Sequence, residues 1–112
     1  MEKSYSGGCF LPGPENKKKI GRLSLEGNLL VLRTEQESFD LEVLKLQLKV
    51  GGASDRIVFF SEKEDGLILY SNDLLILEDA YWDNKSSVKS QIEEWKKKKS
   101  HGRRIFLGGL FV

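Results

Sequence analysis

Short runs of alternating apolar and polar residues fill the middle of the chain and limit what it can fold into. Leu23 and Leu25 alternate with charged and hydroxyl residues, and Gly27-Asn28, a pair that tolerates positive φ, comes next. A continuous apolar run then covers residues 29–32, and a polar turn covers residues 33–37. A period of two over such short runs is typical of half-buried β-strands. The pattern therefore predicts hairpins from residue 20 onward.

The alternation changes phase once, between Val43 and Leu44. A shift of one residue would turn every later side chain to the other face of a sheet, so we expect a bulge, bend or turn at this point. A helix through Leu41, Leu44 and Leu48 would place fewer apolar residues on one face than alternation does. The pattern favours two strands over a helix here.

The second half continues the same design. Residues 56–61 are the most β-prone segment, Asp65-Gly66 is a strong hairpin marker, and residues 67–70 form the returning strand. Residues 74–77 are one more short apolar element. At the other end, residues 5–14 are rich in glycine and proline, and we expect either a short first strand or an ordered arm followed by a loop. Together these segments predict an antiparallel meander.

The period becomes helical after residue 83. Val88, Ile92 and Trp95 recur at i, i+4 and i+7 as one apolar stripe, and Ser86 or Ser87 is placed to cap the first amides. The stripe must cover apolar surface, and the open face or end of the sheet is the available partner. A chain of 112 residues is long enough for one such core. The fold class that we predict is mainly β with one C-terminal α-helix.

Charge is concentrated near the C-terminus. Residues 85–104 hold eight bases against two acids, so a chain of net charge +1 carries a net charge of −5 elsewhere. We expect this basic segment to contact an anionic membrane surface. The residues expected to make this contact are Lys96, Lys97, Lys98, Lys99, Arg103 and Arg104.

Residues 105–112 have no polar side chain. As a helix they would reach roughly 12 Å, against about 30 Å for a bilayer core. They either fold back as a last strand or begin a membrane helix that is cut off here, and the basic flank favours the membrane helix. We therefore divide the chain into a domain over residues 1–95, a basic juxtamembrane linker over residues 96–104 and the start of an apolar segment over residues 105–112.

Catalytic signatures are missing from the sequence. His101 is the only histidine, which excludes a zinc-peptidase helix, and it lies among lysines and arginines as a spacer. Cys9 is the only cysteine and is expected to be a buried side chain rather than a nucleophile. We expect no enzymatic activity and no cofactor. A carboxylate site without a sequence signature is the remaining enzymatic alternative.

A second basic group lies early in the chain, in a segment expected to be a loop that enters a strand. It either binds an anion or keeps the turn soluble. Its residues are Lys17, Lys18, Lys19 and Arg22. The tetralysine lacks interleaved aromatic residues and any known nucleic-acid module signature, so no nucleic acid partner is expected. The N-terminus lacks the apolar region of a secretory signal, which predicts a cytoplasmic location.

Several short motifs resemble the β-rich domain found in front of bacterial membrane metallopeptidases of the HtpX-like, HExxH kind. The matching motifs are Tyr5-x-Gly7, Leu23-x-Leu25-x-Gly27-x-Leu29, Gly51-Gly52-Ala53-Ser54-Asp55-Arg56 with Phe59-Phe60, and Tyr70-Ser71-Asn72-Asp73 with Leu77. The resemblance implies a pleckstrin-homology-like, partly closed barrel capped by the C-terminal helix, on the cytoplasmic face of the inner membrane. It also implies a lipid-facing role for residues 17–19 and Arg22. The protease motif itself is missing from this chain.

These observations predict a non-catalytic cytoplasmic accessory or regulatory domain. It would be tethered to a membrane peptidase, attached or separate, and would act through protein contacts. The alternative is an autonomous module that binds anionic lipid or a membrane surface through its two basic groups.

Overall fold

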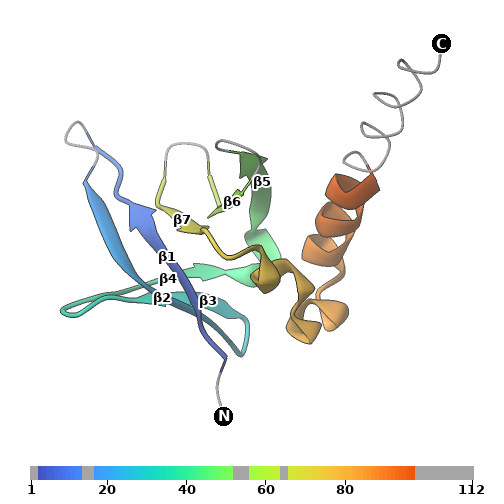
Figure 1. Cartoon of the computed structure of the whole chain (residues 1–112), viewed down its shortest axis with the longest axis horizontal. Helices are drawn as coiled ribbons and strands as arrows, with labels where there is room; N and C mark the ends of the chain where they lie inside the picture. Colours follow the sequence, from blue (N-terminus) through green and yellow to red (C-terminus); the bar gives the residue numbers. More distant parts are fainter. Residues whose placement is uncertain (1–2, 14–16, 52–55, 64–65, 98–112) are drawn as a thin grey trace.

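A strongly curled antiparallel sheet with one helix at its end makes up this computed structural model (Figure 1). Within residues 3–13, 17–51, 56–63 and 66–97, which the structure describes, seven strands have the order β4-β3-β2-β1-β7-β6-β5. Their bounds are β1 (Tyr5–Phe10), β2 (Lys18–Glu26), β3 (Leu29–Arg33), β4 (Ser38–Glu42), β5 (Gln47–Gly51), β6 (Ile57–Ser61) and β7 (Ile68–Ser71).

Two meanders make up the sheet, β1 to β4 and β5 to β7, and the pairing of β1 with β7 joins them. The first segment is therefore a central strand rather than an arm. Glycine makes this position possible, because a Cβ atom at Gly7 would lie 2.0 Å from the backbone oxygen of Tyr70 on the neighbouring strand. Gly27 has a φ of 56° in the turn between β2 and β3, which confirms the predicted hairpin.

The 3-10 helix η1 (Val43–Lys45) lies where the sequence predicts the change of phase. It links β4 to β5, which are the two edge strands of the sheet. The Leu46 amide donates to the Val43 carbonyl at 3.2 Å across this turn. Val43 and Leu46 are buried, whereas Leu44 is 68% exposed. A connection this short holds the two edge strands near each other, so the sheet curls into a partly closed barrel.

Two further 3-10 helices, η3 (Leu74–Glu78) and η4 (Ala80–Asn84), follow β7. The predicted apolar element at residues 74–77 is therefore a 3-10 helix. Asp73 begins η3 by accepting from the Leu75 amide, and Asp79 begins η4 by accepting from the Tyr81 amide. These turns bring Trp82 into the core, where its Nε1 donates to the Ile76 carbonyl at 2.7 Å.

The C-terminal helix is described over residues 86–97 and lies across one side of the barrel (Figure 1). Its apolar stripe is confirmed, because Val88 and Ile92 are buried in the common core. The expected cap is wrong by one residue. The Lys85 carbonyl accepts from the Lys89 amide, so residues 86 and 87 lie inside the first turn. The predicted pleckstrin-homology-like architecture, a partly closed barrel capped by a helix, is confirmed.

Candidate functional site

A groove of about 210 Å³ lies between edge strand β5 and the C-terminal helix. Apolar side chains from the strand, η3 and the helix make most of its walls, and two polar side chains stand among them. The lining residues are Leu48, Val50, Leu77, Gln91, Ile92, Glu94 and Trp95. The groove thus lies between the edge of the sheet at β5 and the C-terminal helix.

Gln91 fixes the helix to the edge of β5. Its Oε1 accepts from the Leu48 amide at 2.8 Å, and its Nε2 donates to the Leu46 carbonyl at 2.8 Å. A side-chain amide that accepts from Leu48 and donates to Leu46 makes the same two hydrogen bonds as one residue of a neighbouring parallel strand. Gln91 therefore occupies the first pairing position along this edge.

The next pairing position belongs to Val50. Leu48 pairs with Phe60 and Val50 with Val58 across the β5–β6 ladder. Because the Leu48 amide points away from β6 toward Gln91, the two-residue period of an antiparallel pair directs the Val50 amide and carbonyl the same way. No described strand pairs with β5 on this side. Among the described residues, the edge at Val50 therefore has no strand partner, and Val50 lines the groove.

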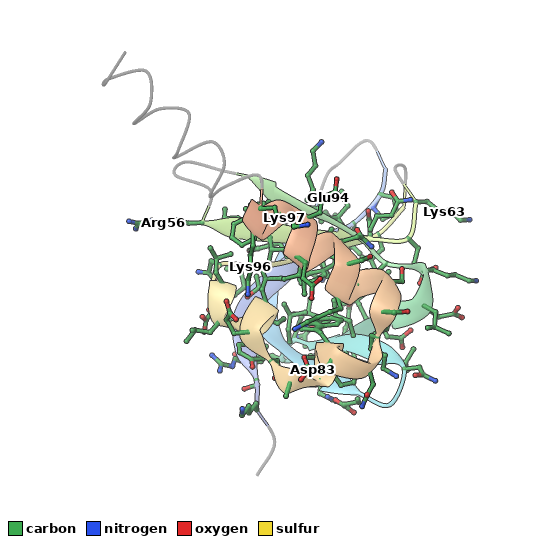
Figure 2. All side chains as sticks on the ribbon, turned by 90° about the vertical axis from the view of Figure 1, so that its right-hand side faces the viewer. Arg56, Lys63, Asp83, Glu94, Lys96 and Lys97 are labelled. Atoms are coloured by element: carbon green, nitrogen blue, oxygen red, sulfur yellow. The ribbon has the colours of Figure 1, made fainter. Side chains whose placement is uncertain are left out.

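Lys96, which the sequence assigns to the linker, lies in the C-terminal helix, and the predicted division of the chain after residue 95 stays a prediction. The helix continues through residue 97, and Lys96 Nζ lies 2.9 Å from a carboxylate oxygen of Glu78 in η3. Figure 2 shows Lys96 directed toward the 3-10 helices. Lys98, Lys99, Arg103, Arg104 and the apolar segment 105–112 lie outside the described residues.

The predicted basic loop lies mostly in strand β2, so its side chains alternate between the two faces of the sheet. Lys18 Nζ is 5.4 Å from the ring centre of Tyr70, and Lys19 Nζ is 3.6 Å from a Glu37 carboxylate oxygen. Arg22 donates to the backbone oxygen and hydroxyl of Ser4. Lys17 precedes the strand and is exposed. The four bases do not converge on one anion site.

Two buried or half-buried titratable groups, Cys9 and Asp79, have shifted pKa values. Burial raises the pKa of the Cys9 thiol, which keeps it protonated and unreactive. Burial works against the ionised form of Asp79, but hydrogen bonds from the Tyr5 hydroxyl (2.6 Å) and the Tyr81 amide hold its pKa below the ordinary value. No group of three or more metal-ligating side chains occurs in the part of the chain that the structure describes.

Two features of the β5 edge, the Gln91 hydrogen bonds and the outward Val50 amide, could not be predicted from the sequence. Gln91 has no motif around it, and its role depends on the helix lying against β5. The outward direction of the Val50 amide at a sheet edge is a consequence of strand order, which alternation alone does not specify. Across the described residues, no helix has the length and apolar character needed to cross a membrane.

Comparisons with family models, with curated proteins and with solved structures find no match to this chain. The similarity to the domain in front of HtpX-like peptidases stays a prediction.

Proposed function

We propose that this chain is a non-catalytic accessory domain that acts through protein contacts. Its groove would take an extended segment of a partner protein as an additional strand on β5. The observation that carries the proposal is the pair of Gln91 hydrogen bonds, which already provide one strand-like contact beside the open edge at Val50. Strand addition to a free sheet edge is a general mode of peptide recognition.

The groove walls define the partner segment. Apolar side chains from Leu48, Val50 and Trp95 favour apolar residues at alternate positions of the ligand, because successive side chains of a strand point to opposite faces. The motif resemblance supports a membrane metallopeptidase, attached or separate, as the owner of this segment. The domain would then act on the cytoplasmic face of the inner membrane.

A peptide selection tests the groove. The whole chain is used to select from a random dodecamer library, and we expect binders with apolar residues at alternate positions. Val50→Pro removes the outward amide, while Val50→Ala trims the side chain and keeps the amide. Binding should be lost in V50P and only weakened in V50A, with far-UV circular dichroism as the check on folding. Equal binding by the two variants would contradict strand addition.

Methylation of the peptide gives a test that does not depend on any variant. In a peptide that adds to β5 as a strand, only every second amide points toward β5. N-methylation of one set of alternate amides should abolish binding, and methylation of the other set should leave it nearly unchanged. Equal sensitivity of both sets would exclude an added strand.

The tether is tested by reading the gene beyond Val112. We expect further apolar residues that complete a membrane span, followed by an HExxH motif. A stop codon directly after Val112 would remove the attached peptidase from the proposal, while the groove would still be tested by the peptides.

A further inference from the structure

Two rows of side chains cross the outer face of β5, β6, β7, β1 and β2. The strand registers place in one row Lys49, Phe59, Tyr70, Gly8 and Ile20, and in the other Gln47, Ser61, Ile68, Phe10 and Lys18. The alternate residues Phe60, Leu69 and Cys9 are fully buried, so both rows point out of the barrel. We call these ten positions the outer sheet face.

Aromatic and aliphatic residues occupy five of the ten positions of the outer sheet face, where a solvated strand face would be polar. The ring of Tyr70 crosses Gly8, packs against Phe10 with ring centres 5.1 Å apart, and is only 8% exposed. Lys18 Nζ lies over both rings. Ile20, in contrast, is 74% exposed.

A hollow of about 590 Å³ lies at the β5 side of this face. Phe59 and Ile68 give it apolar walls, and Lys49 stands at its side. Phe59 and Ile68 at the hollow are half-buried, and Ile20 at the other end of the face is the exposed aliphatic side chain.

The charged residues at the ten positions of the outer sheet face are all bases. The outer sheet face holds Lys18 and Lys49 and no acidic residue, and Arg22 adds a third base two residues after Ile20 on the same face of β2. Glu35, in the turn after β3, borders a separate hollow beside Ile20. A face that joins bases to the exposed aliphatic side chain of Ile20 complements an anionic surface with an apolar layer beneath it.

We propose that the outer sheet face binds the surface of an anionic lipid bilayer. Lys18, Lys49 and Arg22 would lie at the level of the phosphates, and Ile20 would enter the boundary of the acyl chains. A single-stranded nucleic acid fits less well, because base stacking needs open rings and the rings here are covered by Lys18 and by each other. The inference is independent of the groove, which lies on the other side of β5.

Vesicle sedimentation of the whole chain tests the surface. The variant Ile20→Thr with Lys49→Gln removes one exposed aliphatic side chain and one base from the outer sheet face. Its control, Leu44→Thr with Lys45→Gln, removes the same groups from η1, where Leu44 is 68% exposed. On vesicles with 30% phosphatidylserine we expect roughly tenfold weaker binding for the first variant. Equal binding by variant and control would overturn the proposal.

A spin label at position 20 reports on the contact itself. Ile20→Cys and Leu44→Cys are labelled separately, and Cys9 is buried and slow to react. With anionic vesicles, oxygen should reach the label at position 20 more readily and a nickel complex less readily, while the label at position 44 stays in water. A label at position 20 that stays in water would overturn the proposal. Shielding of this label in the absence of lipid, by single-stranded DNA or by a second copy of the chain, would also overturn the proposal.

Discussion

At the residue scale, Gly8 sets how closely β1 approaches β2. A Cβ atom there would lie 2.2 Å from the Lys19 backbone oxygen and 2.8 Å from the Tyr70 hydroxyl. The Lys19 oxygen belongs to the backbone of β2, so it cannot move without disturbing the pairing of β1 with β2. The sequence pattern marked this segment only as rich in glycine, because close approach depends on strand order.

We expect Gly8→Ala to lower the free energy of unfolding by about 1–3 kcal/mol, the usual cost of overpacking. Gly51 is the matched control, since a Cβ atom there would meet only the Phe59 ring at 3.5 Å. Gly51→Ala should therefore be neutral or slightly stabilising. Urea unfolding followed by tryptophan fluorescence measures both, and a G8A protein as stable as G51A would contradict the packing.

Glu26 gives a pH-dependent contribution at the same scale. Hydrogen bonds from Arg33 and then Ser24 lower its pKa to about 2. A carboxyl with a lowered pKa in the folded protein stabilises it above the unfolded value, near 4.5, and this stabilisation is lost as the pH falls toward 2. Arg33→Gln should return the Glu26 pKa toward its ordinary value, as measured by NMR titration of the side chain. An unchanged pKa in R33Q would show that Arg33 is not the cause.

The junction between helix and β5 is the decisive contact at the scale of elements. Strand segments, the phase change at η1 and the apolar stripe of the helix were all predictable, because each follows from local periodicity. The 3-10 nature of residues 74–78 was not, since a short apolar run fits several elements. Gln91 was also missed, because its two partners lie more than forty residues away in the chain.

We expect Gln91→Ala to lower the free energy of unfolding by about 1–2 kcal/mol, because two hydrogen bonds are lost. The Leu48 amide should exchange its hydrogen faster in this variant. Ser90→Ala is the control, because its exposed hydroxyl bonds only within the helix, to the Ser87 carbonyl. Hydrogen exchange measured by NMR distinguishes the two variants. If the Leu48 amide were as well protected in Q91A as in the unmodified protein, Gln91 would not be its hydrogen-bond partner.

At the scale of the whole molecule, the two proposed surfaces lie on different parts of one barrel. The groove lies between β5 and the helix, and the outer sheet face crosses β5 to β2. A domain built in this way could hold a partner segment while resting on a membrane. The membrane contact predicted for the basic groups at residues 17–22 and 96–104 follows from charge runs that are visible in the sequence, and it stays a prediction. The outer sheet face was not visible there, because its residues come from five strands.

Hydrogen exchange at the Val50 amide, with and without a selected peptide, tests the central claim most directly. We predict that peptide binding slows exchange at Val50 strongly and leaves Leu48 unchanged, because Gln91 already occupies the Leu48 amide. A peptide that binds while the Val50 amide exchanges as fast as in the free chain would contradict an added strand on β5.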